Sequence, residues 1–207
     1  MCMVHCAPVP DEFHRMAKHM QHLKALRDIA FSYGVGEHPD LASMARELSR
    51  MVYQNRQSLN DDLADLRTHN KGFERWLVAL RSKPNVTVLV SAWPANHATP
   101  IHDHGGLWGL ELALHGALEV ESWDRDPQGR SLRPMGRDWL GPGDASWFDA
   151  DDRYAHRCRN LSRHDTALTL HVYGGDLAQY ATYERAGETG QWLTWPQRVA
   201  IAGHLHA

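Results

Sequence analysis

The sequence has few cysteines: only three of its 207 residues. An odd, small number of cysteines does not make a disulfide framework, so we expect a reducing compartment, the cytoplasm. No apolar run approaches the length of a membrane span. The first residues also lack the basic and long apolar regions of a signal peptide.

A strong net charge is also absent, because the formal charge is only -3 at pH 7. This balance gives no electrostatic reason to expect nucleic acid or a membrane surface as a partner. Internal repeats, low-complexity tracts and linkers are missing too. A chain of this length can bury a substantial core, so we expect a single domain whose partners are small molecules.

Residues 1–70 have the pattern of a helical region that packs on the rest of the chain. Apolar residues recur every three or four positions, which is typical of amphipathic helices. The break at 32–36 contains two glycines, and Pro39 stands near the start of the next helix. The three predicted apolar stripes are Phe13, Met16, Met20, Leu23, Leu26 and Ile29; Leu41, Met44, Leu48 and Met51; and Leu59, Leu63 and Leu66.

Residues 71–207 change to a β pattern of short apolar, β-branched segments separated by turn residues. Many short strands at close spacing predict a closed all-β barrel or sandwich. The tail 192–207 carries a second His-x-His, with His204 and His206, and we expect a flexible end or lid there. Strands are predicted at 86–93, 107–115, 118–123, 145–148, 154–159 and 167–173, with turns at Gly116, 124–129 and 140–144.

The segment around His102 and His104 carries the most distinctive chemistry. On a strand, side chains two residues apart point to the same face, so both imidazoles can bind one ion. His156, in the same half of the chain, is the candidate third ligand. Imidazole suits iron, zinc, copper or nickel alike, and three protein ligands leave coordination positions free, as catalytic sites require. The alternatives are a solvated loop pair for His102 and His104 and a core histidine for His156.

Residues near these histidines have structural interpretations. Asp103 should face away from the metal, and Asn160 should fix a turn or hydrogen-bond a ligand histidine. We expect Cys158 to be a small buried residue. Trp93, Trp108 and Trp147 are expected in the core or the pocket wall.

The histidine motifs resemble those of the cupin superfamily. His102-Asp103-His104 with the later Gly116 corresponds to its first motif, and Gly136 to Pro142 followed by His156 to Asn160 corresponds to its second. Most cupins carry a glutamate ligand four or five residues after the second histidine, where this chain has Trp108 and Gly109. Glu111 comes later, at a spacing that does not match.

In lacking this glutamate, the chain resembles the cysteine dioxygenase branch, whose members hold Fe(II) with three histidines. Thr169-Leu170-His171-Val172-Tyr173 resembles its Ser-x-His-x-Tyr triad. Phe73-Glu74-Arg75 falls where the cysteine enzymes carry Tyr-x-Arg. Gly109 stands where some members have a cysteine that cross-links to the triad tyrosine, so Tyr173 should be unmodified. An acidic side chain completing the metal's ligand set would contradict this resemblance.

The resemblance implies a jelly-roll-like cupin barrel that is mostly β, with an N-terminal helical region, and an Fe(II) enzyme that oxidises a small thiol with O2 to its sulfinate. Its implied metal ligands are His102, His104 and His156. Tyr173, His171 and Thr169 are the implied catalytic relay. Substrate binding falls to Arg75, which takes the carboxylate in a bidentate fork, with Phe73 and Trp108 beside it.

Three alternatives stay open. Trp108-Gly109 resembles the mercaptopropionate dioxygenases, although those enzymes tend to have glutamine where this chain has Arg75. The second alternative is a cupin that binds metal without catalysis, such as a sensor, but such a protein does not need the relay. The third is another cupin dioxygenase, but those enzymes usually keep the glutamate ligand. Arg75 has the further alternative of an ordinary surface or ion-paired arginine, and the relay that of a polar barrel face. Neither the native thiol nor the oligomeric state follows from the sequence.

Overall fold

A computed structural model describes residues 20–68, 72–126, 131–187 and 191–207. Some predicted features lie outside these ranges. They are the start of the first helix with Phe13 and Met16, and residues 127–129 of the predicted turn. The outcomes below concern the described residues.

The predicted helical region contains two long helices followed by two short ones. The break after Tyr33 is confirmed, and the Asp40 carboxylate caps the second long helix by accepting a hydrogen bond from the Ser43 backbone N–H. In the described part of the chain, no helix combines the length and apolar character needed to cross a bilayer. The helices are α2 (Gln21–Tyr33), α3 (Leu41–Gln54), α4 (Arg56–Asp62) and α5 (Ala64–Thr68).

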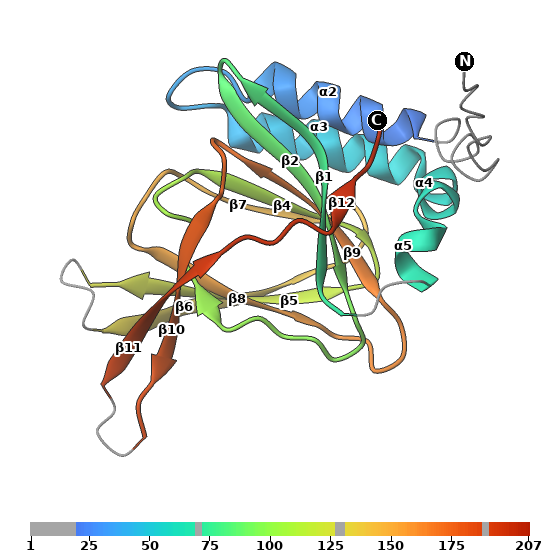
Figure 1. The fold of residues 1–207 in the computed structure, drawn as a ribbon. Helices are drawn as coiled ribbons and strands as arrows, with labels where there is room; N and C mark the ends of the chain where they lie inside the picture. Colours follow the sequence, from blue (N-terminus) through green and yellow to red (C-terminus); the bar gives the residue numbers. More distant parts are fainter. Residues whose placement is uncertain (1–19, 69–71, 127–130, 188–190) are drawn as a thin grey trace, which may run out of the picture.

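The remaining described residues form two six-stranded sheets (Figure 1). The first sheet has the strand order β12-β1-β2-β9-β4-β7 and the second has the order β11-β10-β3-β8-β5-β6. This arrangement confirms the predicted mostly-β architecture with N-terminal helices. The strands are β1 (Glu74–Ser82), β2 (Asn85–Trp93), β3 (Ile101–His102), β4 (Gly109–His115), β5 (Leu118–Arg125), β6 (Leu132–Leu140), β7 (Ala145–Phe148), β8 (Tyr154–Asn160), β9 (Ala167–Tyr173), β10 (Gln179–Arg185), β11 (Trp192–Arg198) and β12 (Gly203–His204).

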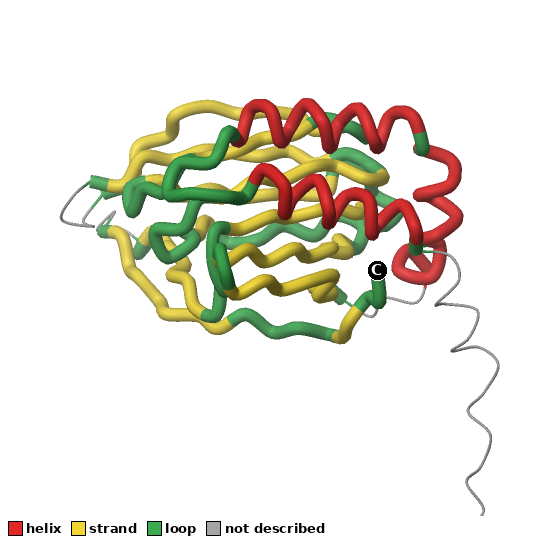
Figure 2. Tube along the Cα trace, turned by 90° about the horizontal axis from the view of Figure 1, so that it is seen from above, coloured by secondary structure: helices red, strands yellow, loops and turns green. Residues whose placement is uncertain are grey.

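Helices α2 and α3 cover the outer face of the first sheet (Figures 1 and 2). Leu23, Leu26 and Leu48 of these helices share one core with the strand residues Val88 and Leu170. A sheet covered on both faces has no solvent side, which explains why the predicted strand at 86–93 is a continuous apolar run rather than an alternating one. The helical stripes are therefore packing surfaces, as predicted.

The other face of the first sheet points toward the second sheet, and this interior holds the polar residues. Successive side chains of a strand alternate between faces. In β9, Leu168, Leu170 and Val172 therefore pack under the helices, while Thr169 and His171 point inward. Register then decides which inward residues meet: Glu111 of β4 pairs with His171 of β9.

The C-terminal tail is ordered as strand, and the expectation of a flexible end or lid is wrong. β11 pairs with β10 along seven residues, and β12 pairs in parallel with β1. Leu205 is buried in the helix-side core, and the Arg27 guanidinium donates a hydrogen bond to the Ala207 carbonyl. The chain end is thus held against α2.

Candidate metal centre

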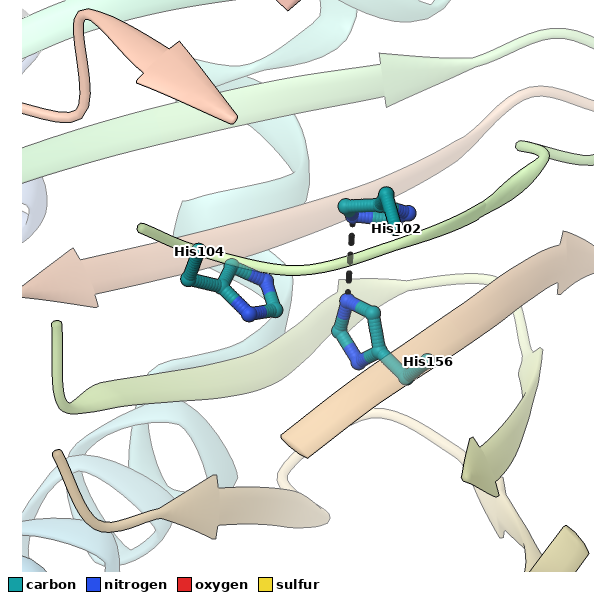
Figure 3. Close-up of side chains that lie close together, drawn as sticks. All are labelled: His102, His104 and His156. Carbon is teal, nitrogen blue, oxygen red and sulfur yellow. Dashed lines mark hydrogen bonds between the residues drawn. The ribbon is translucent and has the colours of Figure 1, made fainter. Parts of the chain in front are cut away.

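Three imidazoles converge between the sheets (Figure 3). His102, His104 and His156 each offer a ring nitrogen, and these nitrogens all lie within 4.8 Å of one another. All three side chains are buried. The convergence depends on strand pairing, because β3 and β8 are neighbours and His102 is the register partner of His156. We expected both histidines of the His-x-His on one strand. Only His102 lies on the short β3, and His104 follows just beyond its end.

His102 is oriented to present a bare nitrogen to this space. Its Nδ1 lies 3.0 Å from the Pro100 carbonyl, and because a carbonyl only accepts, Nδ1 carries the proton. The neutral ring then has a lone pair on Nε2. That Nε2 lies 3.2 Å from Nε2 of His156. A backbone carbonyl holding the far nitrogen is the usual support of a metal-binding histidine.

His104 shows that the space fits a metal ion. Neither of its ring nitrogens has a hydrogen-bond partner in the part of the chain that the structure describes, although both are buried. An imidazole left unsatisfied in this way costs free energy unless another group binds it. Phe148 stacks on the ring with centroids 4.3 Å apart and holds its plane. A bound divalent cation would supply the missing partner.

The imidazoles are in the protonation state that a metal needs. Burial, together with the neighbouring His156, lowers the pKa of His102 to about 3. Burial lowers the pKa of His104 well below its ordinary value and also lowers the pKa of His156. All three rings are therefore neutral at neutral pH, and a metal ion displaces no proton from a charged ring there.

Thr169, His171 and Tyr173 form a continuous hydrogen-bonded row beside the three imidazoles. The Thr169 hydroxyl lies 2.7 Å from Nε2 of His171, and Nδ1 of His171 lies 3.1 Å from the Tyr173 hydroxyl. The Trp93 indole N–H donates to the Thr169 hydroxyl at 2.8 Å. The Tyr173 ring stacks against His104 with centroids 5.6 Å apart. The three side chains thus make the contacts that a relay requires.

Arg75, at the start of β1, lies near the three histidines. Its guanidinium carbon lies 4.6 Å from the centre of the Phe73 ring and 5.8 Å from that of Tyr180. Tyr180 in turn makes an edge contact with His102 at 5.6 Å. The positive charge of Arg75 contributes to the lowered pKa of His102 and of His104. In the described ranges, no carboxylate forms an ion pair with this guanidinium, so it can receive an anion.

The structure places Trp108 in the core, one of its expected positions, but not beside the histidines as the substrate-binding assignment implied, and it places Trp147 at the surface. Trp108 belongs to the helix-side core, where it packs against Gly174 and near Gly34. Its neighbour Gly109 faces inward, so strand alternation turns Trp108 outward, away from the histidines. Trp147 is 47% exposed, and the expectation of a core or pocket-wall position is wrong for it. Trp93 lies inside, as predicted.

Gly109 has no room for a side chain. A Cβ placed there would lie 2.3 Å from Phe148 and 3.0 Å from Tyr173. The aromatic ring of Phe148 thus fills the position at which a cross-linking cysteine would otherwise stand. Cys158 is free, so no cysteine of the described residues is cross-linked to Tyr173.

Asn160, Cys158 and Asp103, the polar residues expected near the histidines, have structural contacts of their own. The Asn160 side chain fixes a turn by donating to the carbonyls of Trp93, Pro94 and Asp165, rather than to a histidine. Cys158 is fully buried, and burial raises the pKa of its thiol well above the ordinary value. The Asp103 carboxylate accepts hydrogen bonds from Ala181 N–H and the Tyr183 hydroxyl, and it lies outside the histidine group.

Sequence spacing missed Glu111, Phe148, Tyr154 and Tyr180. The Glu111 carboxylate is buried, with one oxygen 3.4 Å from Nε2 of His156 and 3.3 Å from Nδ1 of His171. It forms a second candidate ligand group with His156 and Cys158, which shares His156 with the group of three histidines but does not include His102 or His104. Glu111 is brought to His171 by the register of β4 against β9, and motif spacing in the sequence does not predict that register.

Comparison with known proteins places this geometry in a family. The family model described as cysteine dioxygenase type I matches residues 63–186, more than half of the chain. This stretch includes all three histidines, the Thr169–Tyr173 row, Arg75 and Glu111.

Similarities to solved structures are partial. Oxalate oxidase in complex with the substrate analogue glycolate is 14% identical over 52% of this chain and 53% of its own, with a TM-score of 0.40. A sugar phosphate isomerase of the cupin superfamily from Silicibacter pomeroyi is 18% identical over 55% of this chain and 67% of its own, with a TM-score of 0.37.

A conserved protein with a double-stranded β-helix domain from Klebsiella pneumoniae is 17% identical over 57% of this chain and 90% of its own, with a TM-score of 0.41. This chain spans about half the length of oxalate oxidase. The family match shows that the chain belongs to the cysteine dioxygenase type I family.

Proposed function

We propose that this protein is an Fe(II)-dependent thiol dioxygenase that converts a small thiol carboxylate, L-cysteine or a related thiol, with O2 to the sulfinate. The observation that carries the proposal is the convergence of three neutral imidazoles beside an arginine that has no carboxylate partner in the described ranges. The family match supports the same chemistry. A reducing cytoplasm remains the proposed location.

His102, His104 and His156 would hold the iron, since neutral imidazole suits Fe(II). When bound, iron lowers the pKa of the thiol and lets O2 react at sulfur, so that RSH and O2 combine to RSO2H with no further reductant. Three neutral ligands leave the ion's charge uncompensated, which favours an anionic thiolate in the pocket.

Arg75 would bind the carboxylate of the substrate. Its guanidinium lies over the Phe73 ring and near the Tyr180 ring, and these contacts limit its freedom. A planar guanidinium matches a carboxylate in a bidentate fork. Tyr173 would donate a hydrogen bond to the reacting groups beside His104. These residues therefore fix the position of the thiol relative to the three imidazoles.

Oxygen uptake across a panel of thiols tests the proposal, with the products identified by mass spectrometry. The panel contains cysteine, 3-mercaptopropionate, mercaptosuccinate and cysteamine, and a thiol-free substrate serves for the other cupin oxygenases. We expect iron-loaded protein to form a sulfinate from a thiol that carries a carboxylate. Iron-loaded protein that consumes no oxygen with any thiol would instead be a metal-binding module.

The Arg75→Ala variant separates the substrate classes. A charge-assisted hydrogen bond contributes about 1.5–3 kcal/mol, so kcat/KM for cysteine should fall about 10-fold to 100-fold. Cysteamine has no carboxylate and should lose much less. Equal losses for both thiols would remove Arg75 from the substrate site. A native preference for 3-mercaptopropionate over cysteine would favour the mercaptopropionate enzymes.

A further inference from the structure

Glu111 is a buried carboxylate that the proposed chemistry does not use. It is 3% exposed, and in the described part of the chain it forms ion pairs with histidines and with neither lysine nor arginine. Its second oxygen accepts a hydrogen bond from the Cys158 thiol at 3.5 Å. Burying a carboxylate without a cationic partner costs free energy, so its contacts with the two imidazoles call for a physical account.

The Glu111 contact fixes where the proton of His171 lies. Both Glu111 oxygens face groups that can donate, one the Cys158 thiol and the other nitrogens of His156 and His171, and a carboxyl in such surroundings is ionised at neutral pH. The ionised carboxylate only accepts hydrogen bonds. Nδ1 of His171, 3.3 Å from the Glu111 oxygen, therefore carries a proton and donates it, whether the ring is neutral or charged.

The protons of the neighbouring groups follow from this assignment. With its proton on Nδ1, a neutral His171 has a bare Nε2, which accepts from the Thr169 hydroxyl at 2.7 Å. An indole only donates, so the Thr169 oxygen accepts the indole N–H of Trp93 at 2.8 Å. The hydroxyl's own proton is not used in that bond and can be donated to Nε2. Each donor in this part of the row thus has an acceptor.

Tyr173 is the last member of the row. Its hydroxyl oxygen lies 3.1 Å from the same Nδ1 of His171. Because Nδ1 bears a proton, the Tyr173 oxygen accepts there, and its own proton points elsewhere. Burial and the charge of Glu111 raise the pKa of Tyr173 well above its ordinary value, so the hydroxyl keeps its proton.

We propose that Glu111 is a positioning residue: by accepting the Nδ1 proton of His171, it leaves the Tyr173 hydroxyl free to donate a hydrogen bond to a molecule bound beside the three histidines. Without Glu111, His171 can adopt the other tautomer. In that tautomer Nε2 donates to the Thr169 hydroxyl, and the bare Nδ1 accepts a hydrogen bond from the Tyr173 hydroxyl. The proton arrangement depends on the hydrogen bonds alone, and its effect on turnover rests on the proposed function.

Nitrogen-15 NMR of histidine-labelled, metal-free protein tests the proton arrangement directly, with the His171 signals assigned from a His171→Gln variant. We expect the Nδ1–H tautomer in the native protein, the Nε2–H tautomer in Glu111→Met, and the native tautomer in Glu111→Gln, which keeps a carbonyl acceptor. Glu119→Met is the matched control. Glu119 is also buried, but it pairs with Arg137 and Arg159 and should leave His171 unchanged. An Nε2–H tautomer in the native protein, or no change in Glu111→Met, would overturn the proposal.

A double-variant cycle tests the link to Tyr173. Glu111→Met should keep its iron and lower kcat about 10-fold, as expected for a partner of a site residue. If Glu111 acts through Tyr173, adding Glu111→Met to Tyr173→Phe should cost almost nothing more. A full additional loss, or loss of iron from Glu111→Met, would contradict this link. Native protein that oxidises no thiol would contradict the proposed function, while the tautomer measurement still decides the position of the proton.

Discussion

The two faces of the helix-covered sheet carry opposite kinds of residue on the same strands. In β9, Leu168, Leu170 and Val172 pack under α2 and α3, whereas Thr169, His171 and Tyr173 face the pocket and hydrogen-bond one another. The apolar face ties the sheet to the helices and gains free energy by burial. The polar face carries the side chains that hydrogen-bond one another beside the three histidines. Neighbouring residues in sequence should therefore respond very differently to substitution.

The largest expected effect on the pocket side is the loss of metal from His156→Ala. Removing one of three imidazoles leaves two ligands, and iron per folded chain should drop from about one equivalent to a small fraction of it. Metal analysis after gel filtration measures this ratio, and a circular dichroism spectrum shows whether the variant is folded. A full equivalent of iron in the variant would exclude His156 from the metal site.

Leu170→Ala is the matching change on the helix side. Leu170 is fully buried in the core shared with the helices, and truncating such a residue costs about 2–5 kcal/mol. Urea unfolding should show this loss in the free energy of unfolding, with no loss of iron per folded chain. If Leu170→Ala also released the metal, the two faces of the sheet would not be independent.

Tyr173→Phe should affect rate without affecting metal content or fold. The hydroxyl contacts His171 and faces the pocket, but it is not among the candidate ligands. Removing one positioned hydrogen-bond donor from a site costs about 100-fold or more in rate, so kcat with the best thiol should fall by about that factor. Stopped-flow oxygen consumption by iron-loaded protein measures it. An unchanged kcat would reduce Tyr173 to a structural residue.

A further expected effect concerns stability alone: a pH dependence of the free energy of unfolding in the metal-free protein. His102, His104 and His156 resist protonation when folded, because burial lowers the pKa of each ring. In the unfolded chain they take up protons near pH 6.5. The unfolded state thus binds more protons below pH 6.5, and the free energy of unfolding should fall by up to about 1.4 kcal/mol per histidine and pH unit.

Urea titrations at pH 7 and pH 5 measure this slope. His102→Gln should flatten it, because one of the three rings is removed, whereas Leu170→Ala should lower stability at both pH values and leave the slope unchanged. An equal slope in His102→Gln and in the native protein would mean that the imidazole is not held neutral by the fold.

The sequence allowed prediction of the parts of the site that motif spacing encodes. His102 and His104 are two residues apart and Thr169, His171 and Tyr173 alternate, so short-range periodicity shows them on one side. The apolar stripes of α2 and α3 were equally legible. The long apolar run of β2 predicted a strand because its β-branched residues are typical of sheets.

What the sequence did not show depends on pairing between distant strands. Glu111 meets His171 only through the register of β4 and β9. Tyr180 meets His102 because β10 pairs with β3. The strands of the tail were missed because β11 is mostly exposed at the end of its sheet and contains Pro196, a residue typical of edge strands. Trp108 lies in the core, as one expectation had it, but its assignment to the substrate site missed that Gly109 faces inward, so that its neighbour turns toward the helices.

The most direct test of the account uses oxygen gas labelled with a heavy isotope. Iron-loaded protein is given L-cysteine under the labelled gas, and the product is examined by mass spectrometry. We predict a cysteine sulfinate in which both added oxygen atoms carry the label, formed by native protein and not by His156→Ala. Sulfinate with oxygen from water, or equal product from the two proteins, would contradict oxygenation at the three histidines.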